Sequence, residues 1–273
     1  MPVLVRSTDL PRPADTGPSM ITLADRALTR SDHCEVRRVT LPAGEAVMEP
    51  VARDAVVWFQ VLGGSGRVNG QAIDRASVVF ARPGTEVTIA ADHALDLLWT
   101  IVPRADRFDP GLGAAEPGVL VIDWTREPVL QSEHDSRQRI YVATEGLIGT
   151  GAIKAEIITY PPGAAAPEHH HEGAEHFQFV ISGRGTAVLN GVEAPLAAGD
   201  LLYNYENELH WFFTNPDATE DFVFVEFFIP GQCRTVWAKD ANVCAWLPTG
   251  KDSRGAAPVR EIGYHVHGQD AGI

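Results

Sequence analysis

The chain has 273 residues, with 36 acidic side chains against 22 basic ones and a formal net charge of −14. This charge disfavours nucleic acid and anionic membranes as partners, because both require a basic surface. Hydrophobic residues make up 45% of the chain, which is typical of a globular protein that buries a core. No apolar run approaches the roughly 20 residues that cross a bilayer.

The three cysteines, Cys34, Cys233 and Cys244, are widely spaced and odd in number, which favours free thiols in a reducing compartment. The first residues do not combine a basic segment with an apolar one, so the sequence predicts no secretion signal. We therefore expect a cytoplasmic protein. We also expect a homo-oligomer, in its simplest form a dimer.

Short apolar runs rich in β-branched and aromatic residues recur along the chain and predict strands. The clearest are VVWFQVLG at 56–63, IKAEIITY at 153–160, HFQFVISG at 176–183 and DFVFVEFFI at 221–229. Two Asn-Gly pairs, Asn69-Gly70 and Asn190-Gly191, suit the positive backbone angles of two-residue hairpins. The pattern indicates an all-β protein.

The same order of turns and strands occurs twice. PAGEAV at 42–47, FQVLGGSGRVNG at 59–70 and SVVFARPGTEV at 77–87 are followed by PPGAAA at 161–166, FQFVISGRGTAVLNG at 177–191 and DLLYNYENELHW at 200–211. A repeat this long is a whole domain. We therefore predict an N-terminal β-barrel with its linker over residues 1–118, a second barrel over 119–232 and a C-terminal tail over 233–273. The linker is expected at 104–118, which reads RADRFDPGLGAAEPG.

A histidine-rich segment lies in the second copy, at residues 163–185. His169 and His171 are two apart, so on a strand both side chains enter the barrel while His170 points away. His176 follows after a turn, and His210 begins a later strand. Four imidazoles from these positions are predicted to meet at one divalent transition metal ion. Fe(II) is our first choice, and Mn, Ni, Zn and Cu suit the same ligands.

These residues resemble the motifs of the cupin superfamily. The first cupin motif, G-x(5)-H-x-H-x(3,4)-E-x(6)-G, is matched at Gly163, His169, His171 and Gly183, and the second, G-x(5)-P-x-G-x(2)-H, at Gly199 and His210. Tyr205 and Asn207 replace the proline and glycine of the second motif. The resemblance implies two tandem jelly-roll (double-stranded β-helix) barrels, of which the second holds the metal.

The third ligand has two candidates. Counting back from Gly183 places His176 where the family has its glutamate, and four-histidine members of the family carry the same replacement. A loop shorter by one residue would turn Glu175 inward instead. We favour His176. Glu175 then either lies behind the ligands or is the alternative ligand.

The first copy contains no histidine at the corresponding positions, where Val56 and Val87 stand for His176 and His210. We therefore predict a first barrel without metal, with Glu45, Glu49 and Asp54 at its surface. Near the C-terminus, His265 and His267 form a second H-x-H. No further ligand accompanies this pair in the sequence, so we interpret it as part of a pairing strand rather than as a second metal site.

Four neutral imidazoles would leave the ion its full positive charge, which favours small, chelating, anionic substrates. We expect Gln178, Tyr203, Tyr205 and Phe212 to line the substrate pocket. The sequence identifies no catalytic acid or base, although Glu175 and Glu226 are candidates. The resemblance to Fe(II) cupins implies a dioxygenase that cleaves a C–C bond of a catechol, diketone or 2-oxo acid. A redox-neutral hydrolase, isomerase or lyase similar to ureidoglycine aminohydrolase is the alternative, and a non-catalytic binding barrel ranks third.

Overall fold

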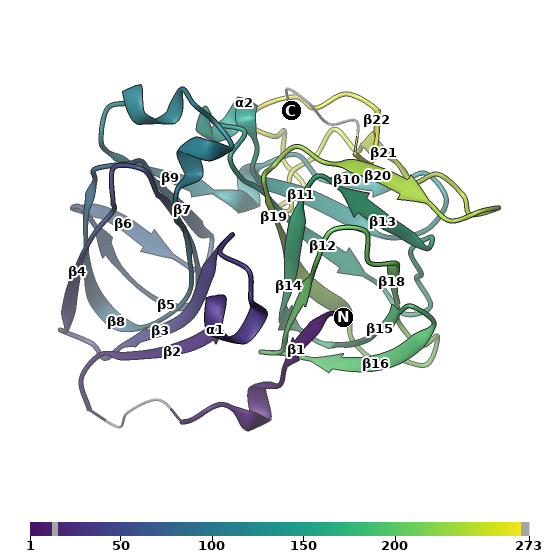
Figure 1. Ribbon diagram of the computed structural model, residues 1–273, viewed down its shortest axis with the longest axis horizontal. Helices are drawn as coiled ribbons and strands as arrows, with labels where there is room; N and C mark the ends of the chain where they lie inside the picture. The colour runs from purple at the N-terminus through teal and green to yellow at the C-terminus, as the bar shows by residue number, and fades with distance from the viewer. Residues whose placement is uncertain (13–15, 269–272) are drawn as a thin grey trace. The chain divides into compact units, whose positions relative to one another are not determined.

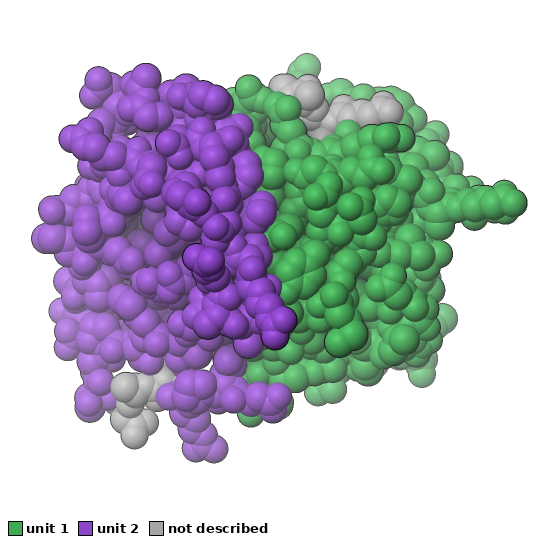
Figure 2. Space-filling view, viewed as in Figure 1, with its two compact units in different colours: residues 1–8, 125–273 green, residues 9–124 purple. Residues whose placement is uncertain are grey.

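The computed structural model describes residues 1–12, 16–268 and 273 of the chain. They form two compact units, one of residues 9–124 and the other of residues 1–8 together with 125–273 (Figure 2). Strands dominate both units, as the sequence predicts, and the helical elements are short (Figure 1). None of the described helices is long and apolar enough to cross a membrane.

The unit of residues 9–124 is built on one sheet in the order β2-β3-β8-β5-β7-β9, with β4 added to β8 and β6 to β5. The strands curve around a common interior (Figure 1). Their bounds are β2 (Ser19–Ala24), β3 (Glu35–Leu41), β4 (Ala46–Pro50), β5 (Val56–Val68), β6 (Gln71–Asp74), β7 (Ser77–Ala81), β8 (Glu86–Val102) and β9 (Val119–Asp123), with the short helices α1 (Arg26–Thr29), η2 (Ala105–Arg107) and η3 (Leu112–Ala114).

The unit that contains residues 125–273 has two sheets, in the orders β1-β17-β14-β19-β12-β11-β10-β21-β22 and β16-β15-β18-β13-β20. The bounds are β1 (Val3–Val5), β10 (Leu130–Ser132), β11 (Gln138–Ala143), β12 (Lys154–Tyr160), β13 (His169–Glu172), β14 (Glu175–Ser182), β15 (Arg184–Leu189), β16 (Val192–Ala197), β17 (Leu201–Asn204), β18 (His210–Phe213), β19 (Phe222–Ile229), β20 (Arg234–Trp237), β21 (Ala245–Pro248), β22 (His265–Val266) and the helix α2 (Glu145–Ile148). The turns η1 (Ser7–Asp9) and η4 (Trp124–Arg126) lie where the chain passes from one unit to the other.

The units are not divided along the chain where the sequence suggested. The expected linker at 104–118 contains η2 and η3, and β9 after it pairs with β7, so the first unit extends to Trp124. Conversely, β1 pairs with β17, so residues 1–8 belong to the second unit. In the first unit β9 hydrogen-bonds to β7, and in the second unit β1 hydrogen-bonds to β17. The hydrophobic periodicity of the sequence does not reveal which strands pair in this way.

The repeat is visible in the backbone. Both Asn-Gly pairs have positive φ at both residues, 46° and 81° at Asn69-Gly70 and 50° and 81° at Asn190-Gly191, and each joins a hairpin. Gly64 and Gly183 each have positive φ and pack so closely on a neighbouring carbonyl that a Cβ atom would lie 1.9 and 2.0 Å from it. Gly64 and Gly183 therefore occupy corresponding positions in the two copies of the repeat.

This alignment shows which residues of the first unit stand at the positions of the candidate ligands. Counting from the glycines makes Val57 the counterpart of His176, one residue beyond the predicted Val56, and Val57 belongs to the buried apolar core. Val87 pairs with Glu49 as His210 pairs with His169, and Val87 also lies in that core. Among the described residues, both groups of three or more side chains that could hold a metal ion lie in the second unit.

Candidate metal centre

Three strands carry the four predicted ligands. His169 and His171 lie on β13, His176 on β14 and His210 on β18, and all four side chains are buried. Strand alternation places them: His169 and His171 are 7% and 1% exposed, whereas the side chain of His170 between them is 24% exposed. His169 and His210 are also paired in register, which brings β18 to the pair on β13.

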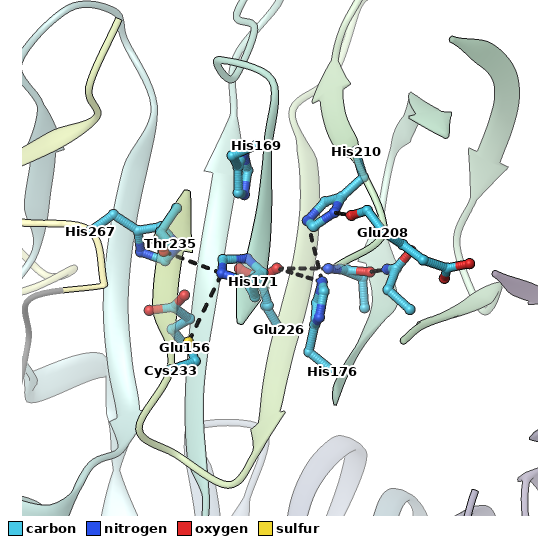
Figure 3. Close-up of polar contacts among 12 residues, drawn as sticks. Glu156, His169, His171, His176, Glu208, His210, Glu226, Cys233, Thr235 and His267 are labelled. Carbon is cyan, nitrogen blue, oxygen red and sulfur yellow. Dashed lines mark hydrogen bonds and ion pairs between the residues drawn. The ribbon is translucent and has the colours of Figure 1, made fainter. Parts of the chain in front are cut away.

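The four imidazoles surround a common space (Figure 3). Successive ring centroids are separated by 4.9 Å from His169 to His171, 4.8 Å from His171 to His176, 4.8 Å from His176 to His210 and 4.6 Å from His210 back to His169. The Nε2 atoms of His176 and His210 are 3.3 Å apart. Two nitrogens bound to one ion at about 2.0–2.1 Å and a tetrahedral angle would be separated by about that distance.

Hydrogen bonds at Nδ1 direct Nε2 toward this space. His169 Nδ1 donates to the carbonyl of Pro167 at 2.7 Å, and His210 Nδ1 donates to the carbonyl of Glu208 at 2.8 Å. His171 Nδ1 lies 3.2 Å from the Thr235 hydroxyl. Such outer bonds are typical of metal-ligating histidines, because they hold the ring and leave the Nε2 lone pair free.

One buried atom indicates what the space is suited to hold. His171 Nε2 is buried without a hydrogen-bond partner. An unpaired buried polar atom is rare and costs free energy unless a partner satisfies it. A divalent ion on Nε2 would satisfy it, so the donor set fits a transition metal.

Burial keeps these imidazoles neutral, which is the form that binds metal. It lowers the pKa of His169, His171 and His176 well below the ordinary value, and neighbouring imidazoles lower the pKa of each one further. Burial also lowers the pKa of His210 to about 4, although the bond to the Glu208 carbonyl opposes the shift. The site therefore excludes protons from its ligands at neutral pH.

A carboxylate that the sequence singled out only as a possible base also reaches the site. Glu226 on β19 lies with one carboxylate oxygen 3.9 Å from His176 Nε2, and it belongs with His171, His176 and His210 to a group able to hold a metal ion. Gln178 donates to Glu226 at 2.6 Å and accepts from Asn204 at 2.8 Å. The chain of hydrogen bonds from Asn204 through Gln178 holds the Glu226 carboxylate in place.

Glu175 is placed differently from His176. The Tyr203 hydroxyl donates to Glu175 at 2.5 Å, and Tyr203 pairs in register with Phe177. Paired residues share a face of the sheet, so Tyr203, Phe177 and Glu175 lie on the face opposite to His176. Glu175 belongs to neither group of potential ligands among the described residues.

The predicted pocket residues do not all lie on the face of the sheet that carries His176. Gln178 is buried beside His176, and Phe212 lines a cavity next to His169. Tyr203 lies on the other face, and the ring centroid of Tyr205 lies 5.6 Å from that of Tyr203. Asn204, the residue after Tyr203, is the β17 residue in register with His176.

Two buried arginines that the sequence analysis did not select line the cavity beside His169. The cavity has a volume of about 20 Å³, room for about one water molecule, and its wall also includes Tyr160, Glu226, Trp237 and His267. Arg137 is paired with Asp135 at 2.7 Å, and Arg139 with Glu156 at 3.2 Å. Arg139 lies on β11 and Arg137 directly precedes that strand. Their spacing of two in the sequence RQRIYVA is the strand signal for side chains on one face.

The C-terminal H-x-H reaches the same region. His265 lies on β22, which pairs with β21 as the strand interpretation predicted. His267 lies beyond the strand, with ring centroids 5.5 Å from His171 and 6.0 Å from His169, and forms a second potential ligand group with them. The sequence did not reveal this group, because His169 and His171 lie about a hundred residues before His267 in the chain.

The comparisons with known proteins agree on the fold. Residues 156–228 match the protein family described as Cupin domain, and no curated protein matches the sequence. A tryptophan-to-tyrosine variant of oxalate decarboxylase from Bacillus subtilis is 14% identical, with a TM-score of 0.67 over 86% of this chain and 79% of that chain. The Bacillus subtilis enzyme studied for its Mn(II) centres is 15% identical, with a TM-score of 0.66 over the same shares. Its structure at pH 4.6 is 15% identical, with a TM-score of 0.65 over 86% and 78%. At these identities the similarity is one of fold.

Proposed function

Because the chain belongs to the cupin superfamily, we propose that it is an enzyme that holds one divalent transition metal ion per chain on His169, His171, His176 and His210. The observation that carries the proposal is the buried, unpartnered Nε2 atom of His171 within a closed ring of four imidazoles. Buried histidine nitrogens in proteins are usually hydrogen-bonded, and an ion on Nε2 would take the place of that partner.

The chain's own residues prepare the site for the ion. Carbonyls of Pro167 and Glu208 orient two of the rings, and the ring of Phe228 covers His176 and His171 at 5.1 and 5.0 Å. This apolar cover excludes water from one side of the ligands. A bound divalent ion with four neutral ligands would supply Lewis acidity toward a chelating anion.

The charges around the cavity favour a small anion as the substrate. Arg137 and Arg139 line it together with Glu226, and the cavity adjoins His169. Each arginine has a carboxylate partner, Asp135 or Glu156, so the buried charges nearly cancel without the ion. A dipositive ion would make the region net positive, and an anionic ligand would offset that charge.

For the reaction, we propose cleavage of a C–C bond by dioxygen with Fe(II) as the metal, on a catechol, diketone or 2-oxo acid. The all-imidazole ligand set supports this choice. A redox-neutral hydrolase, isomerase or lyase with Mn(II) is the second candidate. It is favoured by the fold similarity to oxalate decarboxylase, of which one solved structure concerns the Mn(II) centres.

Anaerobic purification followed by metal analysis and oxygen uptake separates these candidates. Iron at one ion per chain, with oxygen consumed only when a chelating substrate is added, supports the dioxygenase. Manganese with turnover that is independent of oxygen supports the second candidate. His171→Ala should lose both metal and activity, and a variant with one ion per chain would contradict the site.

A further inference from the structure

As the described residues pack, the candidate metal centre is closed to solvent. All four imidazoles are buried, and His169, the most exposed of them, is only 7% exposed. The cavity beside His169 has a volume of about 20 Å³, room for about one water molecule. A chelating substrate therefore reaches the ligands only if part of the surrounding wall moves.

One part of that wall is a strand at the edge of a sheet. β20 ends the strand order β16-β15-β18-β13-β20, so it is held to that sheet through β13. We call residues 234–242, which comprise β20 and the turn after it, the strap. Thr235 pairs in register with His171, and Trp237 pairs with His169. Because paired residues share a face of the sheet, the strap places these two side chains on the face of the ligands.

Both of these strap side chains lie against ligands. The Thr235 hydroxyl is 3.2 Å from His171 Nδ1 (Figure 3). The ring centroid of Trp237 is 5.2 Å from that of His169, and Trp237 lines the one-water cavity. The indole of Trp237 therefore occupies the space next to His169 that a larger molecule would need.

A hollow at the surface lies on the other side of the same wall. It has a volume of about 440 Å³ and is lined by residues 165–168, Trp211, Ala241 and Asn242. Ala166 and Pro167 line both this hollow and the one-water cavity, and Ala241 and Asn242 belong to the strap. The segment 165–168 and the strap therefore lie between the hollow and the cavity beside His169.

Of these two segments, the strap is the one placed to move. Ala166 is anchored, because it lies in the apolar core and its N–H donates to the Phe212 carbonyl at 2.8 Å. The four residues of β20, by contrast, are all half-buried or exposed, and Trp237 packs only partly buried against the apolar cluster that contains Trp246. Segments with little buried surface at the edge of a structure open at the lowest cost in free energy.

We propose that the strap is the gate of the metal centre: it lifts from β13 and carries Trp237 away from His169, so that a small chelating anion enters from the hollow beside Ala241. The space that the indole leaves adjoins His169, and it accommodates a molecule for which the one-water cavity is too small. This inference rests on the proposed function for the identity of the molecule that enters, whereas the opening of the strap is independent of any metal.

A disulfide between the strap and β13 tests the gate. His170 and Val236 are paired in register, and the 24% exposed side chain of His170 points away from the buried ligands. Antiparallel partners have Cα atoms about 4.5–5.5 Å apart, a distance that a disulfide spans. His170→Cys combined with Val236→Cys therefore locks the strap without changing a ligand, and Cys233→Ser removes the half-buried thiol nearby. The reduced form of the same variant is the matched control.

Access to the ligands is measured first in the metal-free protein, as the rate at which diethyl pyrocarbonate modifies His169 in peptide mass spectrometry. We expect modification to be about 10-fold slower in the locked form than in the reduced form, because the rate follows the population of the open state. Trp237→Ala should react faster than the wild-type protein, whereas Trp211→Ala, which alters the hollow but not the cavity, should react like it. His134, with a side chain 45% exposed, is the internal reference and should react equally in every form.

Release of Mn(II) from the loaded protein to EDTA is the second measurement. The locked form should release the ion more slowly, and reduction of the disulfide should restore the rate. Equal rates in the locked and reduced forms, or a Trp237→Ala variant whose His169 reacts like that of the wild-type protein, would overturn the gate. If the wild-type protein bound no Mn(II) while the lock still slowed modification of His169, the proposed function alone would fail.

Discussion

The Nε2 atoms of His176 and His210 lie 3.3 Å apart although the two residues are separated by 34 positions in the chain. Two strands bring them together: His176 enters from β14, and His210 begins β18 directly opposite His169. Both side chains are fully buried, and burial strongly disfavours the protonated form of each. The pair is therefore held neutral, as the proposed metal site requires of its ligands.

The choice between His176 and Glu175 leads to the first prediction. His176→Ala should lower metal affinity by more than about 10-fold, because even the partners of metal ligands are worth that much. Glu175→Gln should bind metal like the wild-type protein, since Glu175 accepts from Tyr203 on the opposite face of β14. Competition with a chromogenic chelator measures both affinities. The reverse ranking would show that Glu175 is the ligand.

The second prediction concerns the identity of the fourth ligand, because Glu226 is an alternative to His169 beside His171, His176 and His210. We expect His169→Ala to lose the ion and Glu226→Gln to retain it. Glutamine at 226 has the same shape and an oxygen that accepts from Gln178, so the amide chain to Asn204 is preserved. Metal analysis after dialysis decides between them, and retention by the alanine variant with loss by the glutamine variant would replace His169 by Glu226 in the site.

A third prediction concerns the closing glycine of the first motif. Alanine at Gly183 meets both a positive φ of 76° and the Asp221 carbonyl, 2.0 Å from the new Cβ. Gly191→Ala is the matched control, since its φ is 81° but no atom lies within 4 Å of the Cβ position. Backbone strain costs each variant about 1–2 kcal/mol. Crowding should lower the free energy of unfolding of Gly183→Ala by about a further 1–3 kcal/mol in urea titrations. Equal losses would contradict the close approach.

A fourth prediction follows from the buried histidines. Their folded pKa values lie below the ordinary 6.5, with that of His210 at about 4, so the unfolded chain binds more protons between these values. The stabilisation is present above about pH 6.5 and is lost as the pH falls toward 4. Each such histidine contributes about 1.4 kcal/mol per pH unit within this range.

Urea unfolding of the metal-free protein at pH 7.5 and 5.5 measures this slope. His210→Leu should reduce the slope by the share of one histidine, whereas His134→Leu, at an exposed position, should leave it unchanged. A wild-type unfolding free energy that is equal at both pH values would show that these histidines are not held neutral.

The sequence by itself determined the strands, the repeat and the main set of histidines. Strand formation follows from local side-chain character, and the Asn-Gly hairpins follow from the few residues that accept positive φ. Alternation along β13 was enough to point His169 and His171 to one side, since that direction is a property of the strand alone.

The tertiary structure decided what depends on contacts between distant segments. It placed Asn204 rather than Tyr203 beside Gln178, because the register of β17 against β14 is set by the whole sheet. Glu226 and Arg139 face the site through pairings of β12 with β19 and β11, and His267 arrives from the C-terminal tail. A sequence shows which groups can bind or donate, but only packing in three dimensions decides which of them share one cavity and which nitrogen of a histidine carries the proton.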